Sequence, residues 1–125
     1  MRPRKSTLTD QELEIMKIVW SRDSATVRDV YEELLKRRKI AYTTVMTVMR
    51  TLEQKGYLKS SQDDRAYVYV PTRPKNQVIK GMVSEFVDRV FNGSAERLVA
   101  HLLEDRHLSE SDLRAIARMI GKGKS

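Results

Sequence analysis

One segment, residues 42–56, constrains the fold of this chain more than any other. Its apolar side chains recur at i, i+3, i+4 and i+7, the spacing of one helix face. They are Val45, Val48, Met49 and Leu52. The opposite face carries hydroxyl, thioether and amide groups with a single arginine, and consists of Thr43, Met46, Thr47, Arg50 and Gln54. Hydroxyls hydrogen-bond to base edges and methyl groups contact thymine, so this face fits duplex DNA; an ordinary surface with few charges is the alternative.

The positive charge of the chain is concentrated in its first part. The 125 residues carry a net charge of +7. Residues 1–75 contain 16 basic and 10 acidic residues, a balance of +6, whereas residues 76–125 contain 8 and 7, a balance of +1. This asymmetry is expected of a protein that binds the phosphate backbone of nucleic acid, although a generic basic protein would share it.

The composition argues against several classes of function. There is no cysteine, which excludes disulfides, cysteine-containing zinc sites and thiol catalysis. No apolar run is long enough to span a membrane, so we expect a cytoplasmic protein without membrane insertion. His101 and His107 are six residues apart, which is not the spacing of two metal ligands on one helix face. No set of nucleophile, base and orienting group is visible, so we expect no enzyme and no cofactor.

Two helices are expected before the DNA-facing segment. Thr9 and Glu12 have the spacing of a capping box and predict a helix over about 10–21, with Trp20 as a core anchor. Thr26 either caps a second helix over about 27–36 or belongs to a short strand. The second helix is expected to bury Val30, Tyr31, Leu34 and Leu35.

A third helix and a hairpin complete the first domain. Gly56 predicts a left-handed end to the helix that contains the DNA-facing segment. Residues 57–60 and 66–70 alternate with period two around a polar loop, which predicts a two-stranded hairpin. Three helices followed by a hairpin is the order of a winged helix-turn-helix domain, expected over residues 1–73. The fold class is therefore mainly α with a small β-hairpin.

This arrangement predicts which residues contact DNA. The third helix enters the major groove with its first turn foremost, while positive charges outside it contact phosphates. The residues expected to face bases or nearby phosphates are Tyr42, Thr43, Thr44, Met46 and Thr47, with Arg50 as a phosphate contact. Arg65 near the hairpin tip is placed for the backbone or minor groove, with a salt bridge to Asp63 or Asp64 as the alternative. Weaker candidates for the backbone are Arg4, Lys5 and Arg28.

The remaining residues, 74–125, predict a helical dimerisation arm. Apolar residues at helical spacing indicate helices over about 75–91, from near Ser94, and after a Ser109 cap. The residues expected to pair the two protomers are Val78, Met82, Phe86, Val90, Leu98, Leu102, Leu113 and Ile116. About fifty residues bury such faces poorly alone, so a second copy of the chain is the expected partner; packing on the first domain is the alternative.

The residues that carry these signals resemble one known family. Residues 41–49 with Leu52, the pair at 55–56, the hairpin segment 64–69 and the opening 8–20 resemble the BlaI/MecI penicillinase-repressor family over nearly the whole chain. The resemblance implies a homodimeric repressor of β-lactam-resistance or related genes. It implies binding to a two-fold-symmetric DNA operator and release through a membrane sensor protease that signals β-lactam.

Two departures from the family pattern bear on function. Staphylococcal members have arginine at the position of Met46, so an arginine–guanine contact is absent and contact with a thymine methyl is expected. Members inactivated by proteolysis are cut at an Asn-Phe pair, and His101-Leu102 occupies that place here. The copper-responsive relatives' cysteine cluster is missing as well. A winged-helix module for protein contacts, or a regulator of another signal, is the alternative function.

Overall fold

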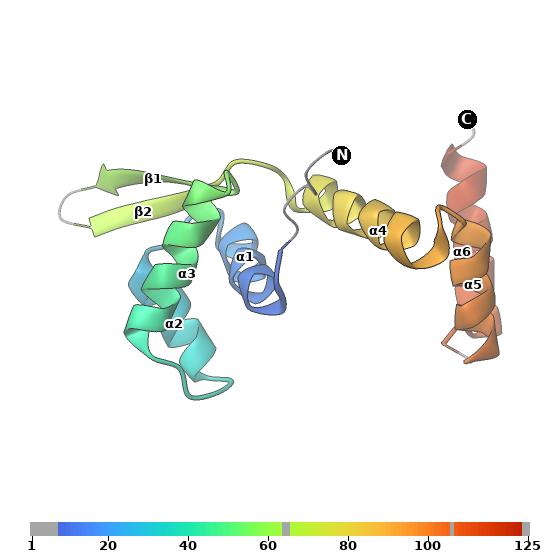
Figure 1. Ribbon diagram of the computed structural model, residues 1–125, viewed down its shortest axis with the longest axis horizontal. Helices are drawn as coiled ribbons and strands as arrows, with labels where there is room; N and C mark the ends of the chain where they lie inside the picture. The colour runs from blue at the N-terminus through green and yellow to red at the C-terminus, as the bar shows by residue number, and fades with distance from the viewer. Residues whose placement is uncertain (1–7, 64–65, 106, 124–125) are drawn as a thin grey trace. The chain divides into compact units, whose positions relative to one another are not determined.

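The computed structural model describes residues 8–63, 66–105 and 107–123 (Figure 1). Within these ranges the order is three helices, a two-stranded antiparallel hairpin and three more helices. They are α1 (Asp10–Arg22), α2 (Val27–Leu35), α3 (Tyr42–Gln54), β1 (Leu58–Asp63), β2 (Ala66–Pro71), α4 (Lys75–Phe91), α5 (Ala95–Glu104) and α6 (Glu110–Gly123). The mainly helical fold with a small hairpin is confirmed. The chain forms two compact units that divide between residues 82 and 83, within α4.

The first two helices begin at reciprocal caps. The Thr9 hydroxyl accepts from the Glu12 amide at 3.1 Å, and the Thr9 amide donates to the Glu12 carboxylate at 2.9 Å. Thr26 and Asp29 repeat this arrangement at the start of α2, at 3.0 Å in both directions. Each pair gives acceptors to two backbone amides that have no partner within the helix. The capping prediction for α1 is therefore confirmed.

The core of the first unit lies between α1, α2, α3 and the hairpin. Its fully buried side chains come from one face of each helix, and they are Ile15, Met16, Val19, Val30, Leu34, Val45, Met49 and Leu52. The predicted apolar stripe of α3 thus faces inward, with Val48 partly buried beside it. The prediction that Leu35 is buried is wrong, because this side chain is 44% exposed. Leu35 follows Leu34 by about 100° around the helix and ends α2, beyond the stripe that contacts the core.

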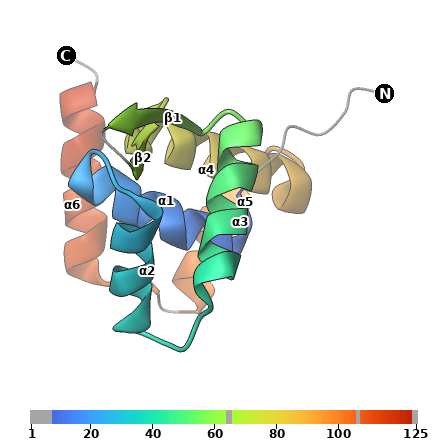
Figure 2. The ribbon, with the colours of Figure 1, turned by 90° about the vertical axis from the view of Figure 1, so that its left-hand side faces the viewer.

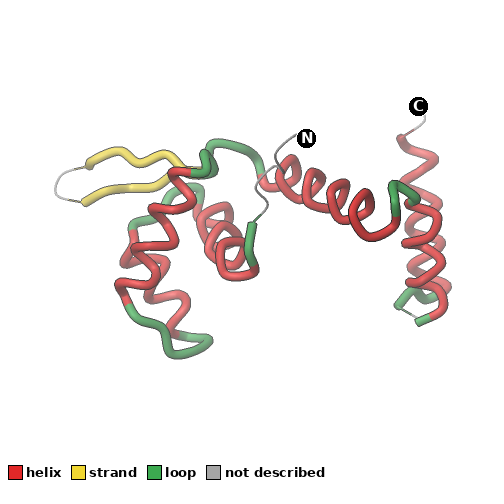
Figure 3. The backbone as a smooth tube through the Cα atoms, in the orientation of Figure 1, coloured by secondary structure: helices red, strands yellow, loops and turns green. Residues whose placement is uncertain are grey.

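The hairpin is attached to the helices by its second strand. β1 and β2 pair from Leu58 opposite Pro71 to Asp63 opposite Ala66. Tyr69 also exchanges two backbone hydrogen bonds with Ala25, at 2.8 and 3.0 Å. Thr26 caps α2, which confirms the first interpretation of this segment, whereas the alternative of a short strand is reduced to a one-residue bridge at Ala25. Figure 3 shows the short loop through which α3 leads into the hairpin, and Gly56 in this loop has a φ of +87°.

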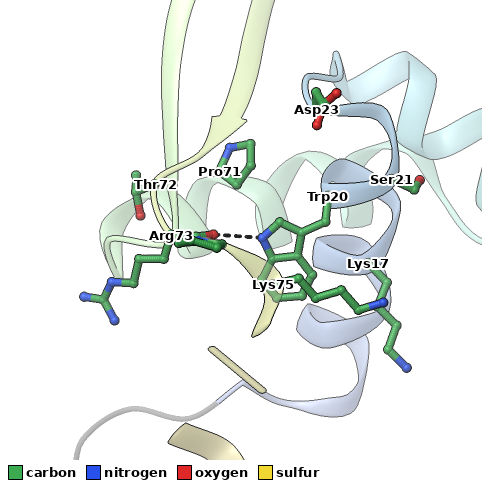
Figure 4. Close-up of a pocket in the computed structure, with 9 residues that line it drawn as sticks. Lys17, Trp20, Ser21, Asp23, Pro71, Thr72, Arg73 and Lys75 are labelled. Atoms are coloured by element: carbon green, nitrogen blue, oxygen red, sulfur yellow. Dashed lines mark hydrogen bonds between the residues drawn. The ribbon is translucent and has the colours of Figure 1, made fainter. Parts of the chain in front are cut away.

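The start of α4 belongs to the first unit. Val78 is 6% exposed and lies in the same core cluster as the helices of that unit, with Met82 packed against it. Trp20 anchors the segment between β2 and α4, because its indole nitrogen donates to the backbone carbonyl of Arg73 at 3.0 Å (Figure 4). The prediction of Trp20 as a residue packed on the core is confirmed. An open cleft of 480 Å³ lies beside this contact.

The second unit contains the rest of α4 with α5 and α6. Ser94 caps α5 by accepting from the Arg97 amide at 3.2 Å, and Ser109 with Asp112 caps α6 at 2.9 and 3.1 Å. The Phe91 ring contacts Phe86 on the same helix, with centroids 5.8 Å apart. Much of the apolar surface of this unit is exposed to solvent. Among the described residues, no helix has the length and apolar character that crossing a membrane requires.

Candidate nucleic-acid interface

A groove of 820 Å³ lies beside one edge of the outer face of α3, and we call it the interface groove. The first turn of α2, one edge of α3 and the hairpin supply its lining. Figure 2 shows the backbone of these elements. The lining residues are Thr26, Val27, Arg28, Tyr42, Met46, Arg50, Glu53, Gln54, Ser60, Ala66, Tyr67 and Tyr69. The fold thus brings Arg28 next to the predicted DNA-facing residues of α3, although they are more than a dozen positions apart in the sequence.

The predicted outer face of α3 is accessible. Thr43, Thr47 and Arg50 are exposed, and Met46 is partly exposed at the edge of the interface groove. Thr44 is half-buried, between the outer face and the core stripe. Within the described part of the chain, the Arg50 guanidinium forms no ion pair with a carboxylate, so its charge is available to an external anion. A short polar face ending in a cation is suited to base edges flanked by phosphate.

Tyr42 is held in place at the start of α3. Its ring meets that of Tyr31 edge to face, with centroids 5.3 Å apart and planes at 79°. The Arg28 guanidinium lies over the same ring at 5.9 Å from its centroid and forms an ion pair with Glu32 at 3.6 Å. Aromatic and cation–π contacts favour one orientation of the Tyr42 side chain. Tyr42 is therefore held in one orientation as part of the lining of the interface groove.

The hairpin contributes four lining residues that the sequence did not indicate: Ser60, Ala66, Tyr67 and Tyr69. The Ser60 hydroxyl on β1 donates to the Glu53 carboxylate on α3 at 2.6 Å, which ties the strand to the helix. Tyr67 and Tyr69 alternate along β2 and share one face, but Tyr69 is 6% exposed whereas Tyr67 is 61% exposed. Burial, reinforced by the nearby Glu53 charge, raises the pKa of Tyr69. The period-two alternation of residues 66–70 puts Tyr67 on the same strand face as Tyr69. It does not indicate that Tyr67 lies outside the core and lines the groove.

Three of the predicted cationic contacts are not described by the structure. Arg4, Lys5 and Arg65 lie outside the described residues, so the structure does not place them. Arg37 and Arg38, in the turn after α2, form ion pairs with Glu14 on α1 at 3.7 and 2.9 Å.

The predicted dimerisation residues divide into three groups by their burial. Val78 and Met82 pack within their own protomer, because the short link of residues 72–74 keeps the first turns of α4 against the first unit. Val78 was predicted to pair the protomers, but its side chain is buried in the core of its own protomer. Phe86, Val90, Leu113 and Ile116 are between 39% and 46% exposed. Leu98 and Leu102 are half-buried within the second unit.

The described residues contain no cluster of three or more His, Asp or Glu that could hold a metal ion. His107 lies 4.0 Å from Asp105 by its Nε2 atom, and both side chains are about two-thirds exposed. His101 contacts the Phe91 ring at a centroid distance of 5.3 Å. The two histidines therefore have separate surroundings.

Three helices packed around one core, a polar third-helix face and a hairpin beside it define the winged-helix class of DNA-binding folds. Residues 8–122 match the penicillinase repressor family. The chain belongs to this family, which confirms the resemblance noted in the sequence.

Relatives and solved structures agree with this assignment. The transcriptional regulator BlaI of Mycobacterium tuberculosis is 37% identical over 116 residues, covering 90% of this chain and 84% of that protein. The penicillinase repressor of Bacillus licheniformis is 28% identical, covering 94% and 92%. Two solution structures match with 30% identity, one of the DNA-binding domain of the repressor BlaI and one of monomeric Bacillus licheniformis BlaI in complex with the blaP half-operator. The first has a TM-score of 0.52 and covers 59% of this chain and 90% of that chain. The second has a TM-score of 0.51 and covers 58% and 89%.

Proposed function

We propose that this protein is a transcriptional repressor that binds duplex DNA through the interface groove and the outer face of α3. The observation that supports this function most is the groove itself, where Arg28, Tyr42 and Arg50 lie beside one edge of the polar face of α3. Phosphates are held by the cations and hydroxyls, while Met46 and Thr47 face base edges. Family membership supports the same function, and so does the structural likeness to a repressor bound to its half-operator.

The proposal includes a homodimer on a two-fold-symmetric operator. The exposed apolar side chains of the second unit support it, because they are numerous for so small a unit: Val83, Phe86, Val90, Val99, Leu103, Leu113, Ile116, Met119 and Ile120. A second copy of the chain covers this surface most simply, since a two-fold interface is self-complementary. Hydroxyl and methyl contacts discriminate weakly between bases, so two linked half-sites supply much of the specificity.

The test is selection of bound duplexes from a random-sequence library by the full chain. We expect a consensus of two inverted half-sites, and at least about 1000-fold tighter binding to the selected duplex than to random duplex of equal length at physiological salt. Sedimentation of the free protein is expected to give a dimer. Equal affinity for both duplexes would remove the DNA-binding function and favour a winged-helix module that binds protein.

The proposal extends to how the repressor is released from DNA and where in the cell it acts. We propose a cytoplasmic, non-enzymatic regulator of β-lactam-resistance or related genes, released through a membrane sensor protease pathway. His101-Leu102, where cleaved relatives have Asn-Phe, lies inside α5, and a protease reaches a peptide bond there only after the helix opens locally. Immunoblotting after β-lactam exposure tests the pathway: loss of full-length chain supports it, and an intact chain that leaves its operator points to another signal.

A further inference from the structure

We propose that Glu53 is a base-reading residue whose carboxylate accepts a hydrogen bond from the amino group of a cytosine in the major groove. The inference rests on the proposed function, because it assigns a specificity determinant to the same interface groove. Glu53 follows Met46 by seven residues and Arg50 by three on α3, and all three line this groove. A carboxylate is a costly lining for a surface that approaches phosphates, since like charges repel. Its presence there calls for a compensating partner.

The carboxylate is oriented by the wing strand. The Ser60 hydroxyl donates to Oε2 of Glu53 at 2.6 Å, a short bond of the charge-assisted kind. The side chain is half-buried, so its movement is restricted. Within the described residues, Oε1 of Glu53 accepts no hydrogen bond, and a carboxylate has acceptor capacity on both oxygens. One oxygen is therefore fixed by the protein and the other is left for a ligand.

The charge of Glu53 is not explained by its contact with Ser60. A neutral glutamine would accept the same hydrogen bond from the Ser60 hydroxyl, so fastening β1 to α3 does not require an ionised group. No basic side chain of the described residues lies within ion-pair distance of Glu53, in contrast to Glu12 and Glu14, which have such partners. A carboxylate that has no basic partner among the described residues, in a groove proposed to face DNA, fits recognition of a hydrogen-bond donor on the DNA.

The donor groups available in the major groove narrow the choice of base. Only the amino groups of cytosine and adenine donate there, and N7 of adenine adds an acceptor beside its amino group. The carboxylate has no proton to offer N7, whereas the cytosine amino group is matched by an acceptor alone. The complement of Glu53 is therefore cytosine at one position of each half-site.

The experiment repeats the library selection with the full-length wild type and with Glu53→Gln, Glu53→Ala and Ser60→Ala. Glutamine both accepts from N6 and donates to N7 of adenine, so Glu53→Gln is expected to change the preference from cytosine to adenine at one position per half-site. Glu53→Ala is expected to erase the preference there and to weaken binding to the wild-type consensus about tenfold. Ser60→Ala keeps the charge but frees the side chain, so the preference at the same position becomes weaker.

A matched control and a separate failure criterion complete the design. Glu33→Gln removes the same charge from α2, outside the groove lining, and is expected to leave the consensus unchanged. The inference is overturned if both Glu53 variants keep the wild-type consensus, or if they weaken every position equally, as loss of the wing contact alone would do. If Glu53→Ala fails to fold, Glu53→Gln decides, because it retains the Ser60 hydrogen bond. A wild-type protein that selects no consensus defeats the proposed function itself, which is a different result.

Discussion

Replacing Glu12 with glutamine removes one charge from a nearly buried ion pair and preserves the shape of the side chain. Glu12 Oε1 lies 2.8 Å from Lys55 Nζ, and the two side chains are 7% and 26% exposed. The same oxygen accepts from the Thr9 amide, so one carboxylate joins the start of α1 to the residue that follows α3. In the variant, the hydrogen bond from the Thr9 amide becomes a neutral one, and the Lys55 ammonium keeps a hydrogen bond but loses the opposite charge of Glu12.

The expected loss follows from these contacts. A hydrogen bond to a charged group contributes roughly 1 kcal/mol more than a neutral one, and Lys55 retains some access to water. We therefore expect Glu12→Gln to lower the free energy of unfolding by about 1.5 kcal/mol at pH 7. Glu12→Ala also deletes the return bond of the cap, and the expected loss is about 2.5 kcal/mol. Urea denaturation of each variant measures both values.

The pH dependence separates this mechanism from a simple packing defect. Burial opposes ionisation of Glu12, but the hydrogen bonds from Lys55 and Thr9 and the Lys55 charge outweigh it and lower the pKa of Glu12 below its ordinary 4.5. A lowered pKa in the folded state contributes stability above the ordinary value, and that contribution disappears as pH falls through the folded-state pKa. The difference between wild type and Glu12→Gln should therefore shrink steadily below about pH 4.5.

The control is Glu32→Gln, which breaks an ion pair with Arg28 whose side chains are 60% and 68% exposed. Such surface pairs contribute little, so we expect a loss below about 0.5 kcal/mol. An equal loss for Glu12→Gln and Glu32→Gln, or a Glu12→Gln loss that is the same at pH 7 and pH 3, would refute the reasoning.

The remaining predictions concern DNA binding and assembly. Arg50→Ala should weaken binding to every duplex and reduce the slope of log affinity against log salt by about 1, whereas Thr47→Val should change the preferred bases and leave the slope intact; titrations at several salt concentrations compare them. Tyr67→Phe, which removes one exposed hydroxyl, should weaken binding to selected and random duplexes alike by about fivefold. A change in sequence preference would contradict a phosphate contact. Phe86→Asp should sediment as a monomer and bind the selected duplex about 100-fold more weakly; a persistent dimer would remove Phe86 from the interface.

Local sequence signals predicted the elements of the first unit well. Capping depends on residues three apart in the chain, so Thr9 with Glu12 and Thr26 with Asp29 are visible without knowledge of the fold. The stripe through Val45 identified the buried face of α3 for the same reason, because one helix face is set by spacing alone.

The errors and omissions arose where a residue's surroundings come from distant segments. Val78 has the spacing of an arm residue, but the core it enters is formed by elements that precede α4 in the chain. Leu35 continues an apolar run and lies past the point where α2 leaves the core. Glu53 and Tyr67 belong to the interface groove only because the hairpin folds back beside α3, and neither periodicity nor composition indicates that contact. Such placements require the tertiary structure.

Trp20 is the only tryptophan of the chain, and its indole is bonded to the segment that links β2 to α4. Its intrinsic fluorescence therefore monitors the first unit and this junction, while the arm contributes no indole emission. Tryptophan fluorescence, excited at the red edge of the absorption band, reports thermal unfolding of the first unit. Far-ultraviolet circular dichroism reports the helices of both units, so comparing the two signals separates the two unfolding transitions without an attached dye. A coincident transition in both signals would mean that the units unfold as a single cooperative block.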